Sequence, residues 1–294
     1  MAHDLQIYPK EKRLKIRRGQ PIRECGLDWF PITMDNYEEF VQCKEALVLR
    51  LSSLPVRYAC MDYFSAVFAL EYDALVNEKN EENSAGNTIG TSGIFVMLMH
   101  LIGLALRIEV TPAVLNESIY YRSENGRVTI EKVHFEQTDA DGIARSADLT
   151  PADFSFTIRP LIAAQNRITL PDESENAELV DAYETKKELG ARGISLNTDT
   201  DDLVSSVAYL SQVTDQEILE WTVRDFENRR RAIDRVMKHQ LYTQAELGGM
   251  VSFKNGNPYP SWCFDSIDNS LGTMAYSELE KTLAGAVSNG GMNG

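Results

Sequence analysis

The longest apolar run in the chain extends from Ile94 to Ile108 and is interrupted by His100 and Arg107. A helix needs roughly 20 predominantly apolar residues to cross a bilayer, and this run is shorter. It therefore predicts a helix over residues 94–107 that is buried in a protein core, and it does not indicate a membrane anchor.

Two more helices are predicted between residues 34 and 76. The first begins near Asp35, carries apolar residues three and four positions apart, and ends at Leu54–Pro55. Pro55 suits the first turn of the second helix, Val56–Val76, whose many aromatic residues require burial in the core or under a partner. The next segment, 77–91, is polar and rich in Gly and Asn, which predicts a loop.

The N-terminal segment is basic and alternates in polarity. Residues 1–23 contain seven Lys or Arg against Asp4 and Glu11, a local net charge of +5. The alternation over Leu14–Arg17 predicts a strand, which we pair with Leu5–Tyr8. We interpret it as an edge strand whose cations discourage aggregation. The alternative is an arm that grips an acidic partner.

A β-hairpin is the clearest signal in the middle of the chain. Two β-rich runs, 118–121 and 127–135, flank the dipeptide Asn125–Gly126, whose residues both tolerate the positive φ of a tight turn. The polar segment 137–150 then marks a boundary. The pattern predicts an α+β, predominantly helical protein with a mixed lobe over 1–145, a helical lobe over 150–265 and a partly flexible tail over 266–294.

The C-terminal half is mainly helical. Helices are predicted over 151–166, where Thr150, Pro151 and Asp153 form a start signal, and over 176–189, 200–212 and 215–247. The longest helix begins at a capping box, Thr214 to Glu217, and ends at Gly248–Gly249. Its apolar residues form one stripe, composed of Leu219, Val223, Phe226, Ile233, Met237 and Leu241. The acidic tract 172–202 is interpreted as a solvated face and linker.

Net charge and cysteine content narrow the function classes. The chain has 29 Lys and Arg against 44 Asp and Glu, a net charge of −15, which disfavours general binding to nucleic acid or to membrane surfaces. Its four cysteines include no close pair, so we expect reduced and mostly buried thiols in a cytoplasmic protein. The N-terminus has no apolar stretch typical of a secretory signal.

Motifs for catalysis or cofactor binding are weak. Gly86, Gly90 and Gly93 precede a helix, but their spacing fits neither a P-loop nor a dinucleotide fingerprint. No cluster of His and Cys has the spacing of a metal site. We therefore predict no catalytic residue, no cofactor and no bound metal.

The residues predicted to bind a partner lie in the C-terminal half. A dense basic cluster includes Arg229 and Arg230, although nearby acids neutralise part of it. The segment 250–262 combines large anchors with two prolines that favour an extended chain. It is either a strap over the end of the long helix or an arm inserted into a partner. The complete predicted set is Trp221, Phe226, Arg229, Arg230, Met250, Phe253, Tyr259 and Trp262.

One family resemblance covers residues 150–265. An acidic helix at 201–207 leads into Glu217–Thr222, a charged helix follows and ends at Ala245–Met250, and a Pro-Tyr-Pro-Ser-Trp segment completes the pattern. Together these motifs resemble the tail-assembly proteins and tail-assembly chaperones of long-tailed bacteriophages and prophages. The resemblance implies no catalysis. It implies a cytoplasmic helper that covers apolar segments of the tape-measure protein, or tail-tube subunits, until the tail polymerises.

Three hypotheses follow. The leading one is a non-enzymatic tail-assembly protein of chaperone type that binds the tape-measure or tail-tube protein and neither nucleic acid nor membrane, with self-association possible. The second is a structural virion subunit of the tail, connector or baseplate. The third is a hydrolase or nucleotide-binding enzyme that uses the loop from Gly86 to Gly93.

Overall fold

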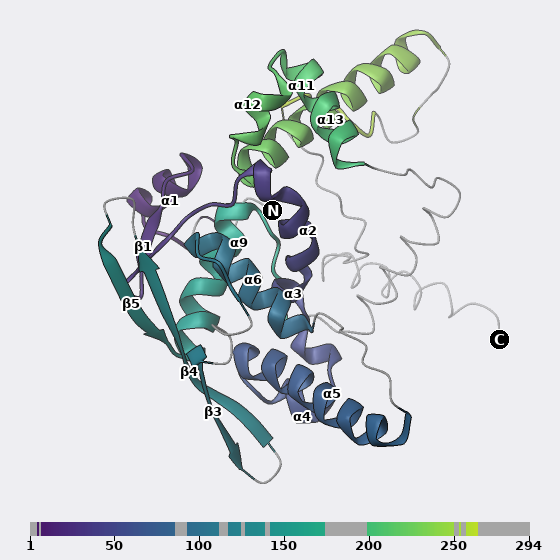
Figure 1. The fold of residues 1–294 in the computed structure, drawn as a ribbon. Coiled ribbons are helices and arrows are strands. Elements are labelled where there is room, and N and C mark those ends of the chain that lie inside the picture. The colour runs from purple at the N-terminus through teal and green to yellow at the C-terminus, as the bar shows by residue number, and fades with distance from the viewer. Residues whose placement is uncertain are drawn as a thin grey trace, which may run out of the picture. The chain divides into compact units, whose positions relative to one another are not determined.

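The computed structural model describes residues 5, 7–85, 93–111, 117–124, 127–138, 142–173, 199–249, 253 and 257–263. The chain divides into two compact units, one of residues 1–180 with 194–231 and one of residues 181–193 with 232–294. The protein is α+β and predominantly helical, as the sequence predicts (Figure 1).

The elements follow one another in a mixed order. The first half contains α1 (Lys10–Arg17), β1 (Ile22–Glu24), β2 (Leu27–Trp29), η1 (Met34–Asn36), α2 (Tyr37–Cys43), α3 (Glu45–Val48), η2 (Leu51–Ser53), α4 (Val56–Ala59), α5 (Tyr63–Ala85) and α6 (Ile94–Leu106). The second half contains β3 (Ile119–Glu124), β4 (Arg127–Thr138), β5 (Ala144–Leu149), α8 (Pro151–Asp153), the π-helical segment η3 (Phe154–Ile158), α9 (Arg159–Asn166), α11 (Thr200–Ser211), α12 (Asp215–Leu219) and α13 (Val223–Leu247).

The predicted hairpin is confirmed as part of an antiparallel three-stranded sheet in the order β3-β4-β5. The turn residues Asn125 and Gly126 lie outside the described residues. A bulge separates the pairs Tyr120–Lys132 and Tyr121–Ile130, leaving Glu131 as the additional residue on β4. Because the bulge shifts the alternation by one residue, the apolar positions before and after it face the same side of the sheet: Val128, Ile130, Val133 and Phe135.

Helix α5 packs against this buried face of the sheet. The hydroxyl of Ser65 accepts a hydrogen bond of 3.1 Å from the Ile130 amide, beside the bulge. Aromatic rings continue inward from α5, where Phe64 stacks on Phe154 with centroids 4.4 Å apart and lies 5.7 Å from Phe95 of α6. The predicted helix 94–107 is confirmed as α6, and most of its apolar side chains are buried.

A buried extended segment, residues 28–34, runs through the middle of the first unit. The side-chain amide of Gln137 on β4 pairs with the backbone of Asp28, accepting from its N–H at 2.9 Å and donating to its carbonyl at 2.8 Å. The same amide donates to the Leu106 carbonyl at the end of α6. Gln137 therefore joins the sheet, the segment and α6 through one side chain.

The rest of segment 28–34 is held in the same way. Two side chains of α9 contribute, because Gln165 donates to the Trp29 carbonyl and the Asn166 carbonyl accepts from the Ile32 amide, both at 2.9 Å. Three backbone hydrogen bonds complete the set. The amide of Phe30 donates to the Ala105 carbonyl, that of Val223 to the Ile32 carbonyl and that of Met34 to the Trp221 carbonyl. Buried backbone groups require such partners, so this segment fixes the positions of α6, α9 and α13 around it.

The predicted N-terminal strand pair is wrong, because Lys10–Arg17 forms helix α1. Alternation over the four residues Leu14–Arg17 is too short to distinguish a strand from a helix. The surrounding Lys, Glu, Arg and Leu residues are strong helix formers, and Pro9 occupies the position before the first helical residue. Only Ile16 of the helix is buried, against the first unit.

The two predicted helices between residues 34 and 76 are each interrupted. The hydroxyl of Tyr63 donates to the Ala46 carbonyl at 2.8 Å and accepts from the Leu49 amide at 3.1 Å, so a later helix supplies the polar partners at the end of α3. Asp62 caps α5 by accepting from the Ser65 amide. Helix α5 continues to Ala85, so the predicted loop 77–91 is helical in its first part, while residues 86–91 lie outside the described residues.

The C-terminal predictions have mixed outcomes. The polar segment 137–150, predicted as a boundary, contains β5 and extends the sheet. The helix 151–166 is confirmed with a π-helical segment inside it, its capping box from Thr150 to Asp153 is present, and helix 200–212 is confirmed as α11. The predicted helix 176–189 and the tail 266–294 lie outside the described residues.

The predicted helix 215–247 is two helices. The capping box at Thr214 and Glu217 is confirmed, but it starts the short helix α12. The Thr222 hydroxyl accepts a hydrogen bond from the Asp225 amide at 3.1 Å and starts α13 separately. The break occurs because Trp221 and Val223 bond to segment 28–34, which a continuous helix would prevent. Helix α13 ends at Leu247, before Gly249 with a φ of +67°.

We predict that Gln137→Leu lowers the free energy of unfolding by about 2–4 kcal/mol, because it removes the polar partners of Asp28 and of the Leu106 carbonyl inside the core. Urea unfolding followed by circular dichroism measures the change. Gln42→Leu on the exposed side of α2 is the matched control and should change stability by less than about 0.5 kcal/mol. Equal effects of the two substitutions would contradict the assigned role of Gln137.

Candidate protein-binding surfaces

The second half of α13 leaves part of its apolar stripe uncovered. In the first unit Val223 and Phe226 of this stripe are buried. In the second unit Met237 is 54% exposed and Leu241, one turn later, is 64% exposed. The predicted stripe is therefore buried in the core at the start of α13 and exposed on the surface near its end.

Phe253 and residues 257–263, the described part of the segment after α13, contact the same helix. Tyr242 contacts the rings of Phe253 and Tyr259, with centroids 5.6 and 4.9 Å apart. His239 Nδ1 lies 2.8 Å from the Tyr259 carbonyl, and Arg235 donates to the Trp262 carbonyl at 3.0 Å. The Trp262 side chain itself is 60% exposed.

The predicted partner-binding residues do not all lie on a surface. Phe226 is fully buried, with its ring 5.9 Å from that of Tyr37, so it belongs to the core and its side chain cannot meet a partner. The carbonyl of Trp221 accepts a hydrogen bond from the Met34 amide of segment 28–34. The Arg229 guanidinium lies 5.6 Å from the centroid of the Trp221 ring. Arg230 forms an ion pair of 2.8 Å with Glu227. Met250 lies outside the described residues.

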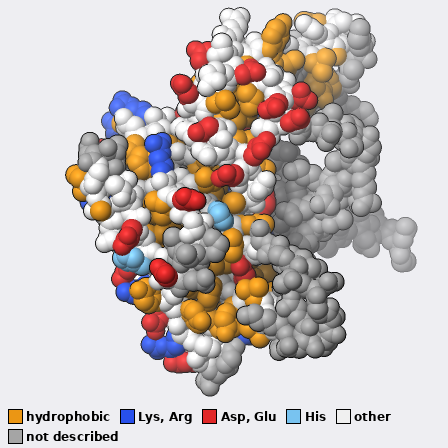
Figure 2. Space-filling model, viewed as in Figure 1, with side chains coloured by type: hydrophobic (Ala, Val, Ile, Leu, Met, Phe, Trp, Pro, Cys, Tyr) orange, Lys and Arg blue, Asp and Glu red, His pale blue; other side chains and the backbone are white. Residues whose placement is uncertain are grey.

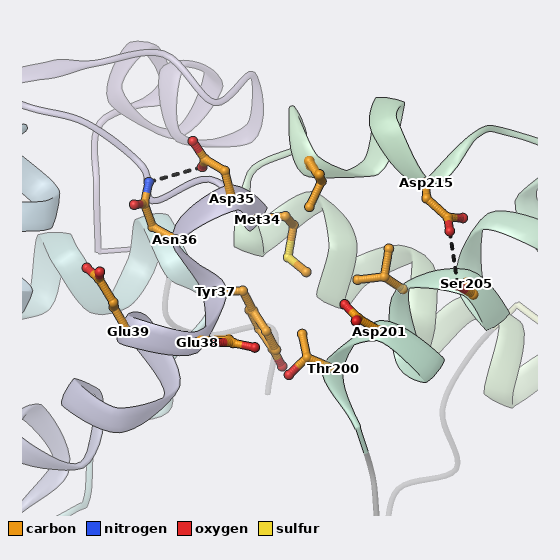
Figure 3. A pocket seen from close by; sticks show the side chains of 12 residues that line it. Met34, Asp35, Asn36, Tyr37, Glu38, Glu39, Thr200, Asp201, Ser205 and Asp215 are labelled. Carbon is orange, nitrogen blue, oxygen red and sulfur yellow. Dashed lines mark hydrogen bonds between the residues drawn. The ribbon is translucent and has the colours of Figure 1, made fainter.

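A groove separates η1 and α2 from α11 and α12 (Figure 3). It has a volume of about 610 Å³, and Met34, Val204 and Leu219 supply its buried or half-buried apolar floor. Exposed carboxylates surround it: Asp35, Glu38, Glu39, Asp201 and Asp215. Glu38 and Asp201 point into the space between the two walls, and none of the described lining residues is Lys or Arg.

The groove has one half-buried tyrosine, Tyr37. Burial raises the pKa of its hydroxyl, the nearby Glu227 raises this pKa further, and Arg230 lowers it by a smaller amount. Tyr37 is therefore neutral at physiological pH.

A second hollow of about 710 Å³ shares Asp35, Asn36 and Leu219 with the groove and includes Arg107. Sequence reasoning missed both, because their walls come from segments that are far apart in the sequence.

The N-terminus of α6, which the third hypothesis assigns to phosphate binding, is occupied by a side chain of this chain. Glu71 on α5 accepts hydrogen bonds from the Phe95 and Val96 amides at 2.7 and 3.1 Å. A Cβ at position 93 would overlap this carboxylate, which explains why Gly93 precedes the helix. Gly86 and Gly90 lie outside the described residues.

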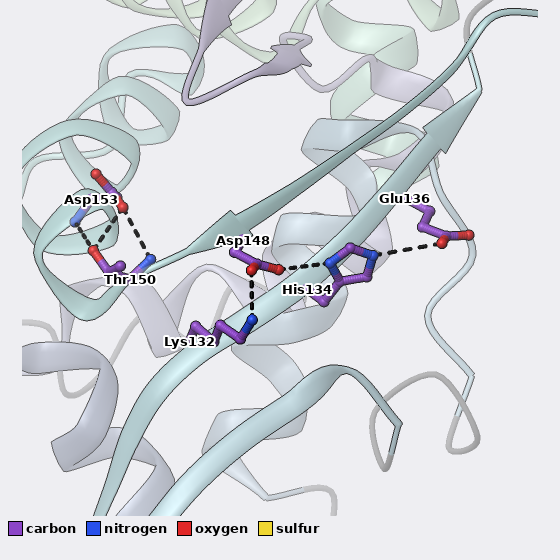
Figure 4. A network of polar contacts seen from close by, with 6 residues as sticks. All are labelled: Lys132, His134, Glu136, Asp148, Thr150 and Asp153. Atoms are coloured by element: carbon purple, nitrogen blue, oxygen red, sulfur yellow. Dashed lines mark hydrogen bonds and ion pairs between the residues drawn. The ribbon is translucent and has the colours of Figure 1, made fainter.

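The open face of the sheet carries a polar cluster around Asp148 (Figure 4). Asp148 forms an ion pair of 2.6 Å with Lys132 and lies 2.7 Å from His134, while His134 lies 3.6 Å from Glu136. Hydrogen bonds from Lys132 and His134 lower the pKa of Asp148, and the bond to Asp148 raises the pKa of Lys132. The cluster is solvent-exposed on a pleated surface, so its geometry fits cross-strand pairing.

The four cysteines have different environments. Cys43 is buried, Cys25 is half-buried, and Cys60 and Cys263 are exposed. All four are free thiols. The expectation of mostly buried thiols is therefore wrong for the last two, of which Cys60 lies in the turn directly after α4 and Cys263 is the last of the described residues 257–263. The pKa values of Cys43 and Cys25 are both raised, mainly because the thiols are removed from water by burial.

The described part of the chain contains neither a metal-binding cluster nor a membrane-spanning helix. In it, no three or more His, Cys, Asp or Glu side chains are grouped so that they could hold a metal ion. No described helix has the length and apolar composition that a membrane span requires. Family models, curated proteins and solved structures contain no match to this chain.

We predict that Gly93→Ala and Glu71→Ala each lower the free energy of unfolding by about 1–2 kcal/mol, because both remove the same cap from α6. The double variant should lose clearly less than the combined single losses, which chemical unfolding of the four proteins measures. Additive losses would show that Gly93 does not act through Glu71.

Proposed function

We propose that this chain is a non-enzymatic tail-assembly protein of chaperone type, from a long-tailed phage or prophage, that binds an apolar helical client through α13. The observation that carries the proposal is the exposed pair Met237 and Leu241, one helical turn apart on the second unit. The resemblance of residues 150–265 to tail-assembly chaperones supports the choice of the tape-measure protein as client, with tail-tube subunits as the related possibility.

The chemistry of this surface suits a helical client. Residues four positions apart on a helix form a continuous ridge, which packs against the apolar side of a second helix. Methionine adapts to different partners because its side chain is unbranched and polarizable. Full burial of each large apolar side chain contributes about 1.5–3 kcal/mol, so two such residues influence affinity strongly.

Charged side chains border the ridge without covering it. Lys238 pairs with Asp234 at 2.8 Å, and Asp234 lies one turn before Met237, so this ion pair borders the ridge at its N-terminal end. At the end of α13, Leu247 is 83% exposed, on a different face of the helix from Leu241. A client with a matching apolar face would therefore meet an uncharged centre with a charged border, as in other protein interfaces.

The proposal requires no reaction centre. Three of the polar groups described above have structural roles: Glu71 caps α6, Asp148 pairs across strands and Gln137 holds segment 28–34. A binding role also fits the net charge of −15, which keeps an exposed apolar surface in solution.

We predict that the double variant Met237→Ser and Leu241→Ser captures at least about tenfold less tape-measure protein of the same genome, because both anchors of the ridge lose their apolar surface. Co-expression with a tagged tape-measure fragment, followed by quantification of the complex and of the soluble client, measures the loss. The matched control, Val56→Ser with Leu75→Ser, changes two exposed apolar residues of the first unit and should bind normally.

Unchanged capture by the ridge variant would reject α13 as the client surface. Detection of the chain in purified particles at a fixed stoichiometry would replace the chaperone role with that of a structural virion subunit. Nucleotide-dependent thermal stabilisation of the protein would contradict the non-enzymatic assignment.

A further inference from the structure

Helix α1 presents unpaired positive charge around an exposed apolar residue. Lys10, Arg13 and Arg17 share one face of the helix by their spacing, and Leu14 lies among them and is 39% exposed. Among the described residues these three cations have no ion-pair partner, whereas Lys12 pairs with Glu24 at 2.6 Å. Ile16 is buried against the first unit and Arg13, three positions before it, is half-buried, whereas Lys10, Leu14 and Arg17 are exposed.

The groove beside η1 has the complementary pattern on the same unit. Its carboxylates surround an apolar floor that includes Met34 and Val204. Within the part of the chain that the structure describes, these carboxylates have no ion-pair partner either. Figure 2 shows blue side chains gathered over α1 and red side chains over α2, α11 and α12, so the two charges are segregated on the surface.

Within the described residues, no ion pair from the same copy neutralises either surface. Helix α1 supplies no residue to the lining of the groove, and its contacts are with α9 and β1. The other basic helix, α13, already uses Arg230 and Arg231 in pairs with Glu227. The cations that match the groove in charge and in apolar content are therefore those of α1.

We propose that the groove binds helix α1 of a second copy of this chain. In this contact Leu14 enters the apolar floor, and Lys10, Arg13 and Arg17 face the carboxylates around it. A reciprocal exchange gives a closed dimer, whereas a one-way exchange gives a ring or a filament. This inference is independent of the client surface on α13.

The first experiment measures self-association of the full chain by sedimentation velocity over a wide range of protein concentrations. The wild-type protein should associate at about 0.1 M NaCl and dissociate at about 1 M NaCl, because the screening length falls from ~10 to ~3 Å. Leu14→Ser should weaken association at constant charge, because it removes the central apolar anchor.

The second experiment exchanges the charges. The groove variant, Glu38→Lys with Asp201→Lys, and the helix variant, Arg13→Glu with Arg17→Glu, should each weaken self-association at least about tenfold. A mixture of the two variants should associate again, because the introduced lysines of one groove then face the introduced glutamates of the other copy's helix. The control, Glu117→Lys with Glu136→Lys, reverses two exposed acids elsewhere and should associate as the wild type does.

The outcomes separate the possible occupants of the groove. Mutual rescue in the mixture establishes the contact, and melting curves show that each variant is folded. A monomer under all conditions, or an oligomer that both charge variants leave intact, overturns the proposal. A groove variant that loses a basic client while its own oligomer persists assigns the groove to another protein and also overturns it.

Discussion

Side-chain amides hold a buried extended segment at the centre of the first unit, and the arrangement of the surrounding helices depends on them. Residues 28–34 cross this region and are buried or half-buried. Gln137, Gln165 and Asn166 supply partners from the sheet and from α9. Each unsatisfied buried group would cost about 1–3 kcal/mol, so the network restricts the packing to one register.

This constraint also positions the groove. The backbone of Trp221 and Val223 bonds to segment 28–34, and η1 follows immediately at Met34. The break between α12 and α13 and the place of η1 are therefore consequences of the same hydrogen bonds. A rigid apolar floor results, while the carboxylates around it are exposed and carry no part of the core.

The surfaces proposed for binding differ in their physics. The ridge on α13 offers apolar area, which gives affinity with little dependence on salt. The groove and α1 offer segregated charge around a small apolar centre, which gives orientation and a strong dependence on salt. In the proposed roles, client binding and self-association can therefore be separated by ionic strength as well as by substitution.

Local patterns in the sequence predicted the elements whose signals are local: the apolar helix α6, the hairpin of β3 and β4, the capping boxes at Thr150 and Thr214, and the apolar stripe of α13. The sequence could not show where helices break, because the partners that interrupt them, such as Tyr63 and the backbone of Ile32, come from distant segments. Tertiary structure alone decided that Phe226 is core and that Met237 is exposed, although both belong to one stripe. The periodicity of a helix defines a face, but only the packing of the rest of the chain determines how far along the helix that face is covered.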